Sequence, residues 1–358
     1  MSLPVPRLPR MARPLAACAL ALAPMIAVRA DEVSEALAKY QKPVDEGIDR
    51  ALEFLAKEQQ SDGSFSSRGM RRNTAITALS VMAFLAKGYT PGTSPYGDVI
   101  NKGIDFVAGA QQWNGMLVGD ARSHGPMYSH TISTLMLSEV TGMVDPERQR
   151  RVDVALGKAL RLILAAQEMR KPRHHQGGWR YQHNSRDSDI SCTGWALMSL
   201  RSARNNGAAV PKESIEEAVK FVMNCRRHDG GFGYQPGGGS GMARTGTALL
   251  CLELCGRHRD RTTIAAGDWI LRNTRHGGRG DFFYYGIYYC SQGMFQLGEQ
   301  HWEKFGAYMY DMLLKLQRSD GSWPEGQGNE NRAGKCYSTA MAVLAMSVAY
   351  RQLPIYQR

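Results

Sequence analysis

One pattern recurs along this chain and limits the folds that it can adopt. An amphipathic helical stretch ends in glutamine, and a turn with glycine and an aromatic residue follows. Gln59 precedes Ser-Asp-Gly-Ser-Phe at residues 61–65, and Gln317 precedes Ser-Asp-Gly-Ser-Trp at residues 319–323. Four weaker copies lie between them, and apolar residues at helical spacing predict a helix before each turn. These helical stretches cover residues 48–60, 104–111, 160–167, 215–225, 269–273 and 309–317.

A second helical stretch follows every turn and is more apolar and richer in small residues. These stretches cover residues 73–86, 130–140, 191–203, 245–255, 288–297 and 337–350. A nearly all-apolar helix must be buried on most sides, whereas an amphipathic helix covers a core with one face. The pattern therefore predicts an inner ring of helices inside an outer ring. The turn glycines are expected to be left-handed caps of the outer helices. The aromatic residues expected to pack the turns are Phe65, Trp179, Phe232, Phe283 and Trp323.

Six helical hairpins account for nearly all of residues 31–358. A closed ring of repeats leaves no apolar end exposed, and the shared strength of the first and last repeats favours closure over an open superhelix. The sequence therefore predicts an all-α, single-domain α/α toroid, an (α/α)6 barrel of six helical hairpins, without significant sheet.

Residues 1–30 have the pattern of a secretory signal peptide. Arg7, Arg10 and Arg13 precede an apolar run over residues 15–28, and small residues lead to a cleavage site after Ala30. The run is too short for a membrane span, and no other stretch is long enough. We expect an exported protein, periplasmic or secreted, with no transmembrane segment in its mature form.

The charge pattern does not indicate a nucleic-acid partner. The formal net charge is +11, four of the arginines lie in the leader, and no long lysine-arginine run follows. Six cysteines remain in the mature chain, too few for the disulfide framework of a small secreted domain. We expect buried thiols, although one or two bridges are an open alternative. Cys251, Cys255 and His258 have helical spacing, but Gly256 ends that helix before the histidine.

The repeat residues resemble two known families. Residues 315–323 (Lys-Leu-Gln-Arg-Ser-Asp-Gly-Ser-Trp) look like the glutamine-tryptophan repeat of squalene-hopene and oxidosqualene cyclases. Residues 228–233 (His-Asp-Gly-Gly-Phe-Gly) resemble the glycine-glycine-phenylalanine repeat of protein prenyltransferase β subunits. The resemblance implies membership of the terpenoid cyclase and protein prenyltransferase superfamily, with its toroid fold. Because these residues are structural, they do not specify an activity.

The motifs of several activities in this superfamily are missing. Zinc-dependent prenyltransferases use Asp-x-Cys and a later histidine, and neither occurs in residues 238–244 or 283–290. Adjacent aspartates and the Cys-Gly-Glu-Gln thioester motif are absent from the sequence. We predict no metal site and no cofactor. A glycosidase would need two facing carboxylates, for which Asp187 with Asp281 or Glu325 is a possible pair that nothing singles out.

One acidic motif does resemble a catalytic one. Asp187-Ser188-Asp189-Ile190 is similar to the Asp-x-Asp-Asp of squalene-hopene cyclases, with isoleucine in the last position. The resemblance implies that Asp189 donates the proton and that Asp187 is its acidic neighbour. The alternative is that Asp189 or Ser191 caps the start of a helix, where both residue types are favoured.

The starts of the six inner helices are expected to meet at one mouth. Their positive dipole ends suit an anion or a polar head group. Aromatic rings in residues 282–289 could stabilise a cation in a cavity, or pack between repeats as aromatics more often do. The residues predicted to bind a ligand are His130, Arg244, Tyr284, Tyr285, Tyr288 and Tyr337.

Two functions fit these features. The first is a terpenoid cyclase-like protein that binds or converts an apolar, isoprenoid-like small molecule in its central cavity, with Asp189 as the acid. The second is a non-catalytic scaffold that binds an exported protein. The partial acidic motif favours the first function. Export favours the second, because the resembling cyclases act on the cytoplasmic side.

Overall fold

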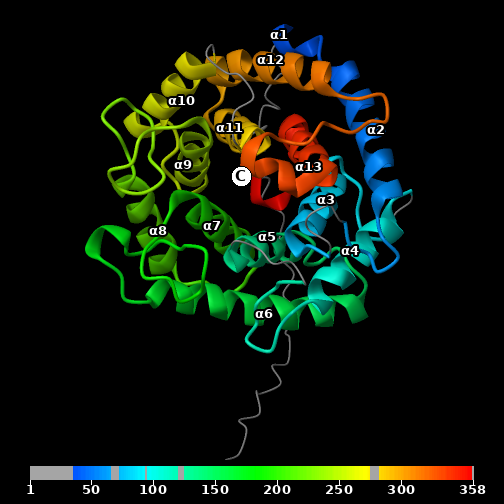
Figure 1. Ribbon diagram of the computed structural model, residues 1–358, viewed down its shortest axis with the longest axis horizontal. Coiled ribbons are helices and arrows are strands. Elements are labelled where there is room, and N and C mark those ends of the chain that lie inside the picture. Colours follow the sequence, from blue (N-terminus) through cyan, green and yellow to red (C-terminus); the bar gives the residue numbers. More distant parts are fainter. Residues whose placement is uncertain (1–34, 66–71, 93–94, 120–124, 275–281, 357–358) are drawn as a thin grey trace, which may run out of the picture.

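The computed structural model describes residues 35–65, 72–92, 95–119, 125–274 and 282–356, and the chain forms a double ring of helices (Figure 1). A short helix, α1 (Glu35–Ala38), precedes the repeats. The outer helices are α2 (Gln41–Glu58), α4 (Gly97–Gly109), α6 (Pro146–Glu168), α8 (Lys212–Asn224), α10 (Arg261–Thr274) and α12 (Glu299–Leu316). The inner helices are α3 (Thr74–Ala86), α5 (Pro126–Glu139), α7 (Ile190–Asn205), α9 (Met242–Leu254), α11 (Phe283–Leu297) and α13 (Gly334–Met346).

The inner helices form a closed ring. Each packs against the next in chain order, and α13 returns to pack against α3. The outer helices cover them, and α12 meets α2 where the chain closes on itself (Figure 1). Among the described residues there are isolated antiparallel bridges but no named strand. The predicted all-α toroid of six hairpins is confirmed.

Burial separates the two kinds of helix as the sequence pattern predicts. Every residue of α3 except Ala75 is buried, whereas α2 buries one stripe that includes Val44, Ile48, Leu52 and Leu55. The core is continuous around the ring. Because the apolar area removed from water is the main favourable term in folding, each hairpin is stabilised chiefly by its neighbours.

The repeat glutamines join neighbouring repeats. The Nε2 atom of Gln59 donates to the carbonyl oxygen of Gly63 in its own turn, at 3.1 Å, and to that of Val99 in α4, at 2.8 Å. Gln111 and Gln167 make the same pair of bonds. Gln317 donates to Gly321 and to Gly47 of α2, at 3.0 and 2.7 Å, and so links the last repeat to the first.

The turn glycines have two reasons to be glycine. Gly63 and Gly321 have φ angles of +85°, which residues with a Cβ rarely adopt. A Cβ at these positions would also lie 2.3 Å from the carbonyl oxygen of Lys102 or Arg50 on the next outer helix. The glycines do not cap the outer helices, as the sequence pattern suggested. The C-caps of α2 and α12 are the extended residues Gln59 and Gln317, and glycine follows four residues later.

In four turns, the backbone N–H of the aromatic residue donates a hydrogen bond to a threonine of the inner helix that follows. The backbone N–H of Phe65 donates to Thr77 Oγ1 at 3.0 Å. The pairs Trp179–Thr193, Phe232–Thr245 and Trp323–Thr339 repeat this bond. Phe283 was expected to be the fifth anchor, but it is a partly buried first residue of α11. The turn glycines before it, at 277 and 278, lie outside the described residues.

The end of the chain differs from its predicted helix. A continuous helix over residues 337–350 was expected, but α13 ends at Met346 and the 3₁₀-helix η3 (Ser347–Tyr350) follows. A further 3₁₀-helix, η4 (Pro354–Tyr356), carries the C-terminus into the centre of the ring, where it packs against α7 (Figure 1).

Two further expectations concern the state of the cysteines and the presence of a membrane-spanning helix. The six cysteines among the described residues are free thiols, and all but Cys255 are buried. The predicted thiols are therefore found in place of a disulfide. Among the described residues, no helix combines the length and the hydropathy that a membrane span requires.

Candidate functional site

Asp189 lies at the mouth of the ring as the N-cap of α7. Its Oδ1 atom accepts a hydrogen bond from the N–H of Cys192 at 2.9 Å, so the capping interpretation is confirmed. The residue is fully buried, and its Oδ2 atom has no hydrogen-bond partner among the described residues. Burial raises the pKa of Asp189 to about 6. A helix cap uses only one carboxylate oxygen, so the second is available for another role.

Two neighbouring loops fix the backbone at Asp189. Its N–H donates to the carbonyl oxygen of Trp179 at 2.9 Å, and the next N–H, of Ile190, donates to that of Tyr234 at 2.9 Å. The side chain of Trp179 is anchored in turn by a bond from Nε1 to the carbonyl oxygen of Ile163. The acid is therefore placed by the third and fourth repeats together.

Asp187 lies beside this acid in a charged and aromatic cluster. Its Oδ2 atom is 2.8 Å from the guanidinium of Arg180 and accepts a bond from Gln235. The Arg180 guanidinium also lies over the rings of Tyr181 and Tyr234, 4.9 and 5.7 Å from their centroids. Asp187 is partly exposed, so it is the acidic residue that faces solvent while Asp189 is enclosed.

Phenol rings surround the Asp189 carboxyl. Burial raises the pKa values of the Tyr234 and Tyr128 hydroxyls, and the nearby Asp189 charge is among the smaller causes that raise both. The Tyr285 hydroxyl donates to the carbonyl oxygen of Ser191 at 3.4 Å, and its ring contacts Trp195. The carboxyl is therefore enclosed by groups that are apolar on their faces and polar at one end.

Three of the predicted ligand-binding tyrosines meet at Glu330, a residue that the sequence analysis did not single out. Glu330 lies in the 3₁₀-helix η2 (Gly328–Ala333) and is 4% exposed. Its carboxylate accepts the backbone N–H groups of Tyr284 and Tyr285, at 3.1 and 3.0 Å, and the hydroxyl of Tyr337 at 3.1 Å. Glu330 thus caps α11 from 46 residues away, and no local motif indicates this role.

His130 and Arg244 lie apart from the acid. His130 Nδ1 accepts the N–H of Leu117 at 3.1 Å, and Nε2 lies 3.2 Å from the carbonyl oxygen of Ala159. Burial lowers the pKa of His130 to about 4, so the ring is neutral, and it holds the turn where other repeats use threonine. The Arg244 side chain donates to the carbonyl oxygen of Gly239 at 3.0 Å.

Aromatic side chains fill the middle of the ring. The Trp195 ring stacks on Tyr288 with 5.4 Å between centroids, and it meets Tyr289 edge-on at 5.2 Å. All three are essentially buried. The Tyr288 hydroxyl points away from the mouth and contacts that of Tyr356 at 2.6 Å. This arrangement corresponds to the packing alternative for the aromatic stretch, and it separates Tyr288 from Asp189.

At the mouth, side-chain oxygens of the protein itself accept hydrogen bonds from the backbone N–H groups at several inner-helix N-termini. Asn73 caps α3, Asp189 caps α7 and Glu330 caps α11. In the described part of the chain, no group of histidine, cysteine and acidic side chains is arranged to hold a metal ion. The described side chains around Asp189 offer carboxyl, phenol and guanidinium groups.

Solved structures with a similar fold include both sugar-cleaving and terpene-forming enzymes. An inactive α-1,6-mannanase variant from Salegentibacter, in complex with α-1,6-mannotriose, is 12% identical, with a TM-score of 0.59 over 86% of this chain and 99% of that one. A variant of a type II terpene cyclase from Scytonema, in complex with merosterolic acid A, is 14% identical, with a TM-score of 0.57 over 88% and 100%. A glycosidase variant is 13% identical, with a TM-score of 0.57 over 87% and 98%.

At such identities these likenesses show the fold alone. A comparison with curated protein sequences gave no match. The model of the prenyltransferase alpha-alpha toroid domain matches residues 15–155, 154–282 and 283–357, which together cover most of the chain. The chain therefore belongs to the prenyltransferase α-α toroid domain family.

Proposed function

We propose that this chain is an exported, terpenoid cyclase-like toroid that binds a small apolar, isoprenoid-like molecule at its mouth and protonates it with Asp189. The observation that carries the proposal is the free Oδ2 atom of a fully buried carboxyl. Leaving such an atom unpaired costs about 1–3 kcal/mol. A proton at Oδ2 would remove the buried charge and leave an O–H group that faces a bound ligand.

The surroundings of Asp189 suit a proton donor. A pKa near 6 means that the carboxyl carries its proton in mildly acidic solution. Transfer of that proton to a carbon–carbon double bond would place a positive charge on the neighbouring carbon, which the faces of Trp195 and Tyr285 could stabilise. Return of a different proton from the cation to the Asp189 carboxylate would restore a double bond and regenerate the acid, so the product would be an isomer. Asp187 would act by holding Arg180 in place.

The filled ring limits the size of the ligand. Trp195, Tyr288 and Tyr289 occupy the middle, so a long chain could not lie along the axis without displacing them. We therefore place the ligand at the mouth, above these rings, and not in a deep central cavity. Tyr284, Tyr285 and Tyr337 would form the opposite rim around Glu330.

Incubation with linear isoprenoids of increasing length tests the proposal. Mature protein should convert short members to isomers of equal mass, detected by gas chromatography and mass spectrometry. Asp189→Asn should lose this activity but still bind, as judged by quenching of tryptophan fluorescence that is absent from the Trp195→Phe variant. The rate should fall as the pH rises through about 6, because the donor loses its proton. Neither conversion nor binding of any member would rule the proposal out.

A second candidate is the non-catalytic scaffold for an exported protein, and one observation favours it. Trp113, in the turn of the second repeat, is 94% exposed. In the sequence, Trp113 comes shortly after α4. A groove of about 490 Å³ lies between α4 and α6, and its lining includes Ala108 and Val154. Large exposed aromatic residues are enriched in protein interfaces.

The first and last repeats have serine at the position of Trp113. Trp113→Ser is therefore a matched variant. If the scaffold function holds, this variant should lose a partner that cross-linking captures on the wild type, whereas Asp189→Asn should keep it. If Trp113→Ser keeps the partner, the scaffold function loses its support and the enzyme is favoured.

A further inference from the structure

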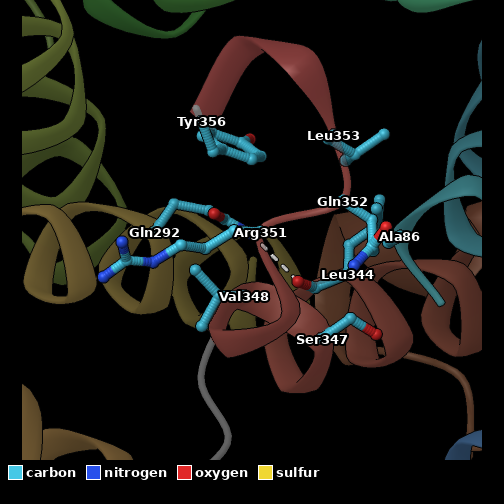
Figure 2. Close-up of a pocket in the computed structure, with 9 residues that line it drawn as sticks. All are labelled: Ala86, Gln292, Leu344, Ser347, Val348, Arg351, Gln352, Leu353 and Tyr356. Carbon is cyan, nitrogen blue, oxygen red and sulfur yellow. Dashed lines mark hydrogen bonds between the residues drawn. The ribbon is translucent and has the colours of Figure 1, made fainter. Parts of the chain in front are cut away.

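Residues 351–356 occupy the opening at the carboxyl ends of the inner helices (Figure 1). Arg351, with a φ angle of +52°, reverses the chain after η3. Leu353, Ile355 and Tyr356 are then 4%, 2% and 4% exposed. Figure 2 shows Tyr356 and Leu353 on either side of the segment, opposite residues of α11 and η3.

Side chains of the inner helices bind the main chain and the phenol of this segment. Glu139 Oε2 accepts the N–H of Ile355 at 3.1 Å. Gln296 Nε2 donates to the carbonyl oxygen of Tyr356 at 3.3 Å, and the Tyr288 and Tyr356 hydroxyls are 2.6 Å apart. A backbone donor, a backbone acceptor and a hydroxyl are thus each met by a buried side chain of α5 or α11.

Glu139 is in an unusual place for a carboxyl group. It is the last residue of α5, at the negative end of the helix dipole, and it is fully buried. Burial raises the pKa of Glu139 to about 7. Ser202 donates to its other oxygen, Oε1. A buried acceptor at this position is explained if its task is to receive a backbone N–H.

The segment is docked onto the ring and does not continue a helix. Within the segment, the N–H of Tyr356 donates to the carbonyl oxygen of Leu353 at 3.0 Å. Beside it lies a small pocket of about 10 Å³, room for about one water molecule, between Gln292, Val348 and the segment (Figure 2). Most of its contacts are therefore with the receiving site.

We propose that the carboxyl end of the inner ring is a binding site for a short peptide with an aliphatic residue followed by tyrosine, and that residues 351–356 occupy this site in cis. Glu139 and Gln296 hold the peptide backbone, and Tyr288 selects the tyrosine. The proposal does not depend on the chemistry proposed for Asp189, which lies at the other end of the helices.

A labelled peptide of residues 351–356, acetylated and amidated, tests the site by fluorescence anisotropy. The protein is the full chain with Leu353→Ser and Tyr356→Ala, which weaken the tail, beside the wild type. We expect micromolar binding to the variant and about 1,000-fold weaker binding to the wild type, because a tethered tail competes at an effective concentration on the order of millimolar. Adding Tyr288→Phe should weaken the binding to the variant about two- to fivefold, because one hydrogen bond is lost.

Failure of the peptide to bind a variant that circular dichroism shows to be folded would overturn the proposal. So would equal binding to the variant and the wild type. If the variant does not fold, hydrogen exchange of the wild type decides. The Ile355 amide should exchange at least 100-fold faster than the slowest amides of α7, because a docked tail opens locally. Equal protection of the two would show that the tail is an integral part of the core.

Discussion

The two ends of the inner ring each contain a fully buried carboxyl group, and the two groups differ in their position on the helix and in their hydrogen-bond partners. Asp189 begins α7, where the helix dipole favours a negative charge, yet one of its oxygens has no partner among the described residues. Glu139 ends α5, where the dipole opposes a negative charge, yet both its oxygens accept hydrogen bonds.

The difference in hydrogen-bond partners indicates that Glu139 serves stability and Asp189 serves ligand chemistry. The bonds to Glu139 join three parts of the chain, so its loss should be felt in stability. The spare oxygen of Asp189 contributes nothing to the fold, so its loss should be felt in ligand chemistry. Residues retained for activity often reduce stability, and the following changes test that distinction.

The largest effect is expected for Glu139→Ala. It leaves the buried Ile355 N–H and Ser202 hydroxyl without their acceptor and removes side-chain volume, so unfolding free energy should fall by about 3 kcal/mol. Urea denaturation measures the change. Glu139→Gln keeps an acceptor oxygen and should cost about 1 kcal/mol. Equal costs for the two variants would contradict the role of the hydrogen bonds.

The next effect is a pH-dependent gain from Asp189→Asn. The folded pKa of Asp189 is raised to about 6, so its contribution is present below the unfolded pKa of 3.8 and is lost as the pH rises through about 6. The amide keeps the cap acceptor and does not ionise. Relative to wild type, the variant should therefore gain about 1–2 kcal/mol between pH 4 and pH 8. A difference in stability that does not change with pH would show that Asp189 is not desolvated.

A smaller change in stability, a loss and not a gain, is expected when His130 is replaced. Its folded pKa is lowered to about 4 from 6.5, so its contribution is present above pH 6.5 and is lost as the pH falls through about 4. His130→Thr, which copies the residue of the other turns, should cost about 1 kcal/mol at pH 7, because the carbonyl group of Ala159 loses its donor. The cost should shrink by pH 4.5. Thermal unfolding at both pH values measures it.

The smallest effect is expected for Tyr356→Phe. It removes one hydroxyl from the pair with Tyr288 at the tail end, so unfolding free energy should fall by about 0.5–1 kcal/mol. The same loss in Tyr288→Phe, and no further loss in the double variant, would show that the two hydroxyls act together. Additive losses would show that they do not.

Prediction from sequence succeeded for the repeats and for part of the mouth. The cap at Asp189 follows from its position before an apolar helix, and the nearness of Asp187 follows from spacing. The grouping of Tyr284, Tyr285 and Tyr337 was expected in position, but its organiser, Glu330, was not. His130 was predicted to bind a ligand because the starts of the inner helices were expected to meet at one mouth. The structure uses it to satisfy a turn, 13 residues after Leu117.

The sequence alone determined the ring, because its information is periodic and local. Helical spacing recurs in the repeats, four repeats share the glutamine that bonds to the next repeat, and similar contacts between neighbours then close the circle. Only the tertiary structure decided which polar groups meet across it. The bonds from Glu139 to Ile355 and from Glu330 to Tyr284 join residues 216 and 46 positions apart. Such pairs depend on how the closed ring fills its two ends, which no repeating pattern encodes.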